Sequence, residues 1–156
     1  MRVLVTGCFD IIHPGHIHLL KEAAKLGDVF VIVARDSTIE RYKKEKPIIP
    51  EQQRLEVIKS IKYVSDAVLG SEGNGNSGYL QFALTLKPDI IFLGPNQRTS
   101  VKYLKEGLEK YHFEHVQVKR LDKIYDKFDL NSSSAIKKKI KNNLSYNTKR
   151  SDKEKN

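Results

Sequence analysis

Short runs of apolar residues alternate along this chain with longer segments in which apolar residues recur every three or four positions. The short runs lack the polar alternation of a half-exposed strand, which indicates strands buried on both faces. The longer segments have the spacing of amphipathic helices. The predicted strands cover residues 2–6, 28–34, 67–69, 89–93 and 116–118, and the predicted helices cover residues 16–26, 37–44, 51–61, 79–87, 101–111 and 132–142.

Strands that alternate with helices predict an α/β fold, with a single doubly wound (Rossmann-like) parallel sheet of five strands and helices on both faces. Ligands bind such sheets beyond the carboxyl ends of the strands, where the strand order reverses. The loop after the first strand and the loop that begins at Gly94 are therefore the candidate binding segments.

Composition narrows the class of protein. A chain of 156 residues, 39% of them apolar and 30% charged, fits one domain with one sizeable core. No apolar run is long enough for a transmembrane helix, and the apolar stretch near the N-terminus is too short for a secretory signal. The single cysteine excludes an internal disulfide framework and a Cys-rich zinc site. Together these features predict a cytoplasmic protein.

The net charge of +9 is concentrated near the C-terminus. Residues 137–156 hold eight Lys or Arg and two Asp or Glu, a net charge of +6, which leaves +3 for the rest of the chain. We therefore expect a domain over residues 1–142 and a basic, flexible tail over residues 143–156. Such a tail is either a solvated extension or an electrostatic arm that docks on RNA or an acidic partner.

Two histidines stand three residues apart in the loop after the first predicted strand. His13 and His16 flank Pro14 and Gly15, where a helix is predicted to begin. Free N–H groups and the helix dipole attract anions at a helix start, and two imidazoles would add hydrogen-bond donors. This arrangement suits a polyphosphate whose charge moves in a transition state. The alternative is a capped helix with two incidental surface histidines.

The pattern Gly-x-Phe-Asp followed by His-x-Gly-His resembles the signature of the cytidylyltransferase-like nucleotidyltransferases. The resemblance runs from residue 2 to about residue 140 and implies transfer of a nucleoside monophosphate from a nucleoside triphosphate to an acceptor phosphate, with release of pyrophosphate. It implies a homodimer and a divalent cation such as Mg²⁺ that accompanies the triphosphate. It also implies that the two histidines are catalytic and that the first loop binds the nucleotide through Gly7, Cys8, Phe9, Asp10, His13, Pro14, Gly15 and His16.

Residues 33–39, 47–55 and 87–94 are most similar to archaeal FAD synthases, which adenylylate FMN. Arg54 is an always-charged fork suited to phosphate, and we expect it to be catalytic; the alternative is an exposed helical arginine. In the related glycerol-3-phosphate cytidylyltransferases, lysines of the preceding loop contact the acceptor phosphate. The resemblance therefore implies acceptor binding by Lys44 and Lys46, with Lys44 also catalytic, although a lysine run is more often only solvated.

The loop that begins at Gly94 is a third matching segment. Gly94 and Asn96 are expected at the nucleotide and Arg98 at the acceptor. Relatives usually carry an acidic residue where this chain has Asn96, and this departure leaves the choice between ATP and CTP open. Pro95 removes a backbone donor from the same loop.

The segment at 131–136 resembles the one that closes over the nucleotide phosphates in this family. Hydroxyls and N–H groups at a helix start suit phosphate, so Ser132, Ser133 and Ser134 are expected to bind the nucleotide; the alternative is a simple N-cap. Lys127 corresponds to an arginine of the family that precedes this segment, and is expected at the nucleotide.

One motif is a decoy. Residues 73–78 fit G-x-G-x-x-G, but no acidic residue ends the next strand as in a dinucleotide-binding fingerprint, so a flexible loop is expected.

Several functions remain open. The leading hypothesis is synthesis of FAD from ATP and FMN, with apolar walls for the flavin ring sought among Tyr42, Tyr103, Tyr125 and Phe128. The alternatives are a CTP-dependent enzyme with an acceptor like glycerol 3-phosphate, or an adenylyltransferase for a sugar phosphate such as heptose phosphate. The non-enzymatic alternative is a nucleotide- or RNA-binding protein that docks through its basic tail.

Overall fold

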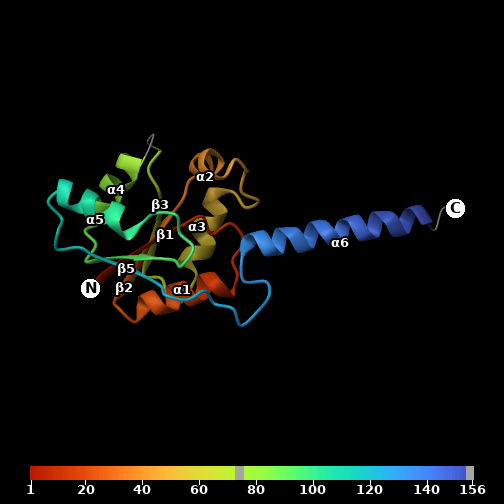
Figure 1. Cartoon of the computed structure of the whole chain (residues 1–156), viewed down its shortest axis with the longest axis horizontal. Coiled ribbons are helices and arrows are strands. Elements are labelled where there is room, and N and C mark those ends of the chain that lie inside the picture. Colours follow the sequence, from red (N-terminus) through yellow and green to blue (C-terminus); the bar gives the residue numbers. More distant parts are fainter. Residues whose placement is uncertain (73–75, 154–156) are drawn as a thin grey trace.

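The computed structural model describes residues 1–72 and 76–153, and it describes side chains for residues 1–72 and 78–146. Five parallel strands form one sheet in the order β3-β2-β1-β4-β5 (Figure 1). The predicted α/β architecture is confirmed. The strands are β1 (Arg2–Gly7), β2 (Asp28–Val33), β3 (Asp66–Leu69), β4 (Ile90–Leu93) and β5 (Gln117–Arg120).

The helices follow the predicted order, with boundary differences. They are α1 (Pro14–Ala24), α2 (Asp36–Lys43), α3 (Glu51–Lys59), α4 (Asn76–Thr85), α5 (Val101–Lys110) and α6 (Ser133–Lys153). The loop expected through residue 78 ends earlier, because α4 begins at Asn76. The central residues of the G-x-G-x-x-G decoy, 73–75, lie outside the described residues.

Alternate residues of the central strands face apolar clusters on opposite sides of the sheet, which is why these strands are continuous apolar runs. Val3 and Val5 of β1 pack with Leu20 of α1 and Ile58 of α3 on one face of the sheet. On the other face, Leu4 packs with Ala83 of α4, and the neighbouring β4 residues Ile91 and Leu93 pack with the buried leucines of α5. The sheet is therefore doubly wound.

The strand order reverses between β1 and β4, which lie side by side at the centre of the sheet. The chain leaves β1 toward β2 and β3 on one side, whereas it leaves β4 toward β5 on the other. The carboxyl ends of these two strands bring together the loop after Gly7 and the loop that begins at Gly94. A parallel sheet binds ligands at this switch point.

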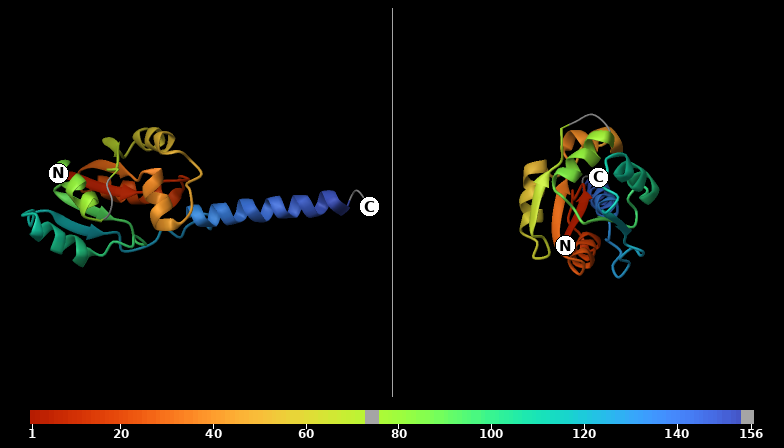
Figure 2. Two further views of the ribbon diagram at one scale, coloured as in Figure 1. Left: turned by 90° about the horizontal axis from the view of Figure 1, so that it is seen from above. Right: turned by 90° about the vertical axis from the view of Figure 1, so that its left-hand side faces the viewer.

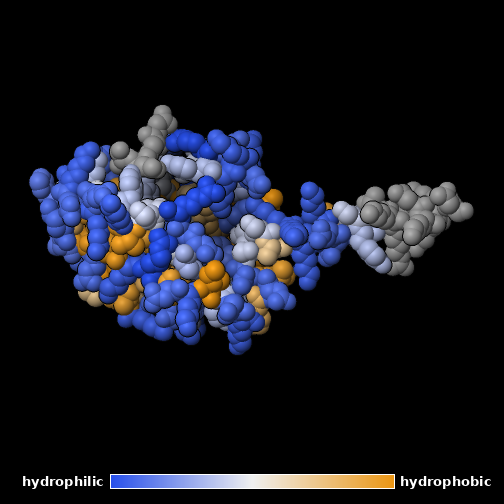
Figure 3. All heavy atoms as spheres, in the orientation of Figure 1, coloured by the Kyte–Doolittle hydropathy of each residue, from blue (hydrophilic) through white to orange (hydrophobic). Residues whose placement is uncertain are grey.

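Helix α6 extends away from the sheet and its covering helices (Figures 1 and 2). It continues eleven residues beyond the predicted end at residue 142, so most of the segment expected to be a flexible tail is helical to Lys153; residues 154–156 lie outside the described part. The side chains of residues 133–146 are mainly hydrophilic in Figure 3, although Ile140 and Leu144 are exposed. No helix of the described residues is both long enough and apolar enough to cross a bilayer.

Candidate active site

The two histidines of the first loop stack on one another at the start of α1. The ring centroids of His13 and His16 are 3.7 Å apart, and the rings are inclined by 26°. Phe9 lies behind them, with its ring centroid 5.1 Å from that of His16, and is only 2% exposed. Phe9 adopts a positive φ of 51°, so the chain turns sharply after β1 and places this ring in the core. The sequence-predicted histidine pair is thus brought together by the loop and the first helical turn.

Both histidines are neutral at physiological pH. Burial lowers the pKa of His16 to about 3, with further lowering by the charges of His13 and Lys43, and burial also lowers the pKa of His13. The Nδ1 atoms of both rings are buried and have no hydrogen-bond partner in the described structure. A buried N–H without an acceptor is less tolerable than an unused lone pair, so the proton of each ring belongs on Nε2. The pair therefore offers two neutral Nε2–H donors.

The start of α6 packs directly against this loop. A Cβ atom at Gly15 would lie 2.9 Å from the carbonyl oxygen of Asn131, so only glycine allows this close approach. The hydroxyl of Ser133 donates to the carbonyl oxygen of Ile11 at 3.2 Å. The hydroxyl of Ser132 accepts from the amide of Ala135, so Ser132 caps α6. The segment that holds Ser132 and Ser133 therefore lies beside the histidine loop, and Ser132 also acts as the N-cap of α6.

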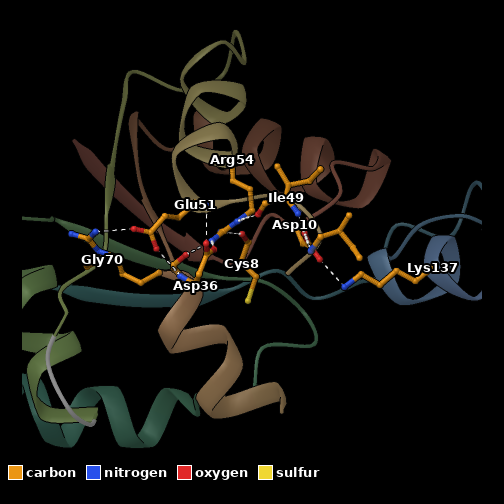
Figure 4. A network of polar contacts seen from close by, with 11 residues as sticks. Cys8, Asp10, Asp36, Ile49, Glu51, Arg54, Gly70 and Lys137 are labelled. Atoms are coloured by element: carbon orange, nitrogen blue, oxygen red, sulfur yellow. Dashed lines mark hydrogen bonds and ion pairs between the residues drawn. The ribbon is translucent and has the colours of Figure 1, made fainter. Parts of the chain in front are cut away.

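Asp10 is buried, and both oxygens of its carboxylate already have partners within the protein (Figure 4). The amides of Ile48 and Ile49 donate to Oδ1 at 2.8 and 2.9 Å, and Lys137 Nζ lies 2.6 Å from Oδ2. Burial alone would raise the pKa of Asp10, but Lys137 and the two amides outweigh it and leave the pKa lowered. Asp10 therefore joins three segments. Lys137 was not singled out from the sequence, where it is one lysine of a basic run.

The surroundings of Arg54 in the structure differ from both sequence-based interpretations of this residue. Arg54 is 1% exposed, so it is not an exposed helical arginine. Its guanidinium donates to the carbonyl oxygens of Cys8, Ala34 and Ile49 and forms an ion pair with Asp36 at 2.6 Å (Figure 4). These bonds turn the donors toward the protein, which disagrees with the expected direct role at phosphate. Arg54 fastens the first loop to the segment after β2 and to the loop before α3.

Reciprocal bonds join the starts of α2 and α3 beside Arg54. The amide of Asp36 donates to the carboxylate of Glu51, and the amide of Glu51 donates to the carboxylate of Asp36. Arg35 pairs with the same glutamate at 2.9 Å and donates to the carbonyl oxygen of Gly70 (Figure 4). Carboxylates at helix N-termini are favourable because of the helix dipole. This network fastens the start of α2 to the start of α3, and the lysine loop, residues 44–50, connects the two helices.

The lysines of this loop are exposed. Lys44 ends α2 in the left-handed conformation with φ 60°, and Lys46 lies in the irregular segment that follows. Lys43 contributes to the lowered pKa of His16, so its charge lies within electrostatic reach of the histidine pair. The sequence-based choice among Lys43, Lys44 and Lys46 favoured the last two, because the register of the helix end is not visible in a run of lysines.

The loop that begins at Gly94 is held against the end of β1. Gln97 accepts from the amide of Gly94 at 2.8 Å and donates to the carbonyl and hydroxyl oxygens of Thr6. The hydroxyl of Tyr79 donates to the same Thr6 hydroxyl, and burial raises the pKa of Tyr79. Asn96 and Arg98 are exposed on this loop. The loop that begins at Gly94 is thus bonded to the strand that leads into the histidine loop.

The segment before α6 lies against α1. Tyr125 stacks on His18 with ring centroids 4.9 Å apart, and Phe128 follows at 6.2 Å from Tyr125. Residues two apart on a helix point to opposite sides, so His18 and His16 do not share a face. The expected flavin walls Tyr125 and Phe128 are therefore on the side of α1 away from the histidine pair. Lys127 is exposed, with its Nζ 5.7 Å from the ring centroid of Phe128.

Comparisons with known proteins agree with this geometry. The model of the cytidylyltransferase-like family matches residues 4–144. The FAD synthase of Methanothermus fervidus is 47% identical over 142 residues, which are 88% of this chain and 93% of the relative. The FAD synthase of Pyrococcus abyssi is 43% identical over 139 residues, 88% and 91% of the two chains. A crystal structure described as a lipopolysaccharide core biosynthesis protein from Thermoplasma volcanium superimposes with a TM-score of 0.73 at 42% identity, over 81% of this chain and 98% of that one.

Proposed function

This chain belongs to the cytidylyltransferase-like family and is a nucleotidyltransferase, and from that premise we propose that it makes FAD and pyrophosphate from ATP and FMN. One observation carries the proposal. The neutral, stacked histidine pair lies at the switch point of a chain whose curated relatives, 43% and 47% identical over 88% of its length, are FAD synthases.

In the proposed reaction, a phosphate oxygen of FMN attacks the α-phosphorus of ATP. A new P–O bond forms, the bond between the α-phosphorus and the α,β-bridging oxygen breaks, and pyrophosphate leaves with that electron pair. The protein forms no covalent bond to the nucleotide. Catalysis then consists of positioning and of stabilising charge on the phosphates.

We assign the nucleotide phosphates to the donors around the start of α1. His13 and His16 would donate from Nε2, and because both rings are neutral they would act as hydrogen-bond donors rather than as charges. The start of α6 would add N–H groups and the serine hydroxyls. The remaining proposed nucleotide contacts are Gly7, Cys8, Pro14, Gly15, Gly94, Asn96, Lys127, Ser132, Ser133 and Ser134.

The acceptor phosphate would bind to exposed cationic side chains on the lysine loop and on the loop that begins at Gly94. Lys44, Lys46 and Arg98 are the proposed acceptor contacts, and the structure adds Lys43 because its charge reaches His16. Arg54 and Asp10 take a different role in the proposal. Their polar atoms bond to protein groups, so they would hold the loops in place and would not contact substrate.

A divalent cation such as Mg²⁺ fits this site only as a companion of the triphosphate. Residues 1–72 and 78–146, whose side chains are described, contain no cluster of three His, Cys, Asp or Glu side chains that could hold a metal. The carboxylates nearest the first loop, Asp10 and Asp36, bond to Lys137 and Arg54. Mg²⁺ commonly binds through substrate phosphates and water, and would screen their charge here.

A second candidate function is adenylyl transfer to a sugar phosphate. The specific observation that favours it is the 42% identical Thermoplasma volcanium structure, whose description refers to lipopolysaccharide core biosynthesis. A homodimer also remains a proposal, and light scattering coupled to size-exclusion chromatography would test it.

The experiment that tests the function is a matrix of ATP and CTP against FMN, glycerol 3-phosphate and heptose 1-phosphate. Pyrophosphate release is the readout, and formation of FAD is checked by chromatography. We expect pyrophosphate release for ATP with FMN. Release only with a sugar phosphate, or only with CTP, would overturn the proposal. His16→Ala serves as the control for contaminating activity, because it must lose whichever signal the wild type shows.

A further inference from the structure

One arginine outside the first loop binds an unusual number of backbone oxygens. Arg120 is the last residue of β5 and pairs in register with Leu93, the residue before Gly94. Its Nη1 donates to the carbonyl oxygens of Gly94, Gln97 and Pro95 at 2.7, 3.0 and 3.4 Å, and its Nη2 donates to that of Thr99 at 2.5 Å. One guanidinium therefore gathers four carbonyl oxygens from a six-residue segment. We call residues 94–100 the clamped loop.

The clamp fixes the direction of the N–H groups in this loop. In a trans peptide the C=O and N–H bonds point in opposite directions, and no cis peptide occurs in the described chain. Because the carbonyls of Pro95, Gln97 and Thr99 point at Arg120, the following N–H groups point away from it. These are the amides of Asn96, Arg98 and Ser100.

The three outward amides have no protein partner. Within the described residues, none of the N–H groups of Asn96, Arg98 and Ser100 donates to a protein acceptor. The matching carbonyls are already used by the guanidinium. The outer side of the clamped loop therefore offers hydrogen-bond donors and no matching acceptors, and the positive charge behind it polarises each peptide in the same direction.

The clamped loop is also fixed at the switch point. Gln97 bonds it to Thr6 at the end of β1, which is the strand that leads into the histidine loop. A rigid row of donors at this place suits a ligand rich in acceptors, which is the chemistry of a nucleoside triphosphate.

We propose that Arg120 is a positioning residue for the nucleotide, because it holds the clamped loop so that the amides of Asn96 and Arg98 donate to the nucleoside triphosphate. This inference rests on the proposed function for the identity of the nucleotide. Arg120 itself stays behind the loop and does not touch substrate. Lysine cannot replace it, since a single ammonium cannot reach all of these carbonyls in the geometry of a planar fork.

The test compares Arg120→Gln and Arg120→Lys with Lys119→Gln, an exposed neighbour on the same strand. Nucleotide affinity is measured by calorimetry with an ATP analogue in which a methylene group replaces the α,β-bridging oxygen. FMN affinity is measured separately by flavin fluorescence. We expect both Arg120 variants to lose about tenfold or more in affinity for the analogue and a clearly smaller factor for FMN, because Arg98 is the one proposed FMN contact in the clamped loop, whereas Lys44 and Lys46 lie outside it. Lys119→Gln should match the wild type in both.

Equal losses for the two ligands, or no loss for the analogue, would overturn the proposal, because a merely structural arginine has no reason to affect only one substrate. If the variants fail to fold, amide hydrogen exchange of the wild type provides a second test of the proposal. The analogue should slow exchange at the amides of Asn96 and Arg98, whereas FMN alone should not. Unchanged exchange at both amides would also overturn it. A wild type that protects these amides with the analogue but makes no FAD would support this inference and overturn the proposed function.

Discussion

Lys137 and Asp10 form an ion pair of 2.6 Å that connects the beginning of α6 to the histidine loop. The same carboxylate accepts from the amides of Ile48 and Ile49, so one buried group touches the first loop, the lysine loop and α6. The start of α6, with the serines proposed to bind phosphate, is thereby connected to the loop that carries the proposed acceptor lysines.

Lys137→Met should destabilise the fold, because it leaves the Asp10 carboxylate buried with only the two amides as partners. We expect a loss of about 1–3 kcal/mol in the free energy of unfolding, measured by urea denaturation. Lys138→Met is the matched control, since Lys138 is exposed, and it should stay within about 0.5 kcal/mol of the wild type. Equal effects of the two substitutions would show that the ion pair contributes nothing specific.

Arg54→Lys should be strongly destabilising although it preserves the charge. A lysine cannot bond simultaneously to the carbonyls of Cys8, Ala34 and Ile49, so buried oxygens would lose their donors. We expect a loss of about 3–5 kcal/mol, measured as a lower midpoint of unfolding. The neighbouring exposed residue Gln53 provides the control in Gln53→Lys. If Arg54→Lys keeps wild-type stability and loses only substrate affinity, Arg54 is a ligand-binding residue after all.

His13→Ala and His16→Ala should each lower kcat on the order of 10²–10³-fold, with smaller changes in KM, because a donor to transition-state charge is lost. Both variants should stay folded, as judged by circular dichroism. His16→Gln should retain more activity than His16→Asn, because the glutamine amide lies closer to the position of Nε2. Near-normal turnover of either alanine variant would contradict a catalytic role and favour the alternative of a capped helix with two incidental histidines.

The pH dependence of stability should report the buried neutral His16. Its pKa falls from 6.5 to about 3 on folding, so above pH 6.5 neither state is protonated and the group has no effect. Below that pH the unfolded chain takes up the proton and the folded chain does not. Stability is then lost as the pH falls toward 3, by up to about 1.4 kcal/mol per pH unit.

Urea denaturation of the wild type and of His16→Gln over this range would measure the effect. The variant should lose the share of the slope that His16 contributes between about pH 6 and pH 4, whereas His13, whose pKa is also lowered by burial, still contributes in the same direction. Titration of Asp10 does not affect this comparison of the two slopes between about pH 6 and pH 4. Its folded pKa is lowered from 3.8, so its contribution is present above that value and is lost only in stronger acid. The same slope in both proteins would contradict a neutral His16.

The fold and the histidine loop were predictable because apolar runs, helical spacing and the His-Pro-Gly-His motif are local in the sequence. The role of Arg54 was not, since its carbonyl partners come from three separate segments and backbone oxygens leave no mark on side-chain patterns. Lys137 was hidden for a related reason: among the lysines at 137–139, only the phase of α6 decides which one meets Asp10. The end of α6 was missed because its Asn, Ser and Thr residues are weak helix formers.

The central position of β1 also bears on how the chain assembles during synthesis. Strands β1, β2 and β3 all lie within the first 69 residues, so this half of the sheet can pair before the rest of the chain has left the ribosome. Strand β4 must then add to the free side of β1, and α6 follows more than 60 residues after β3. A nascent chain therefore holds the histidine motif long before it holds the serines of the proposed nucleotide site.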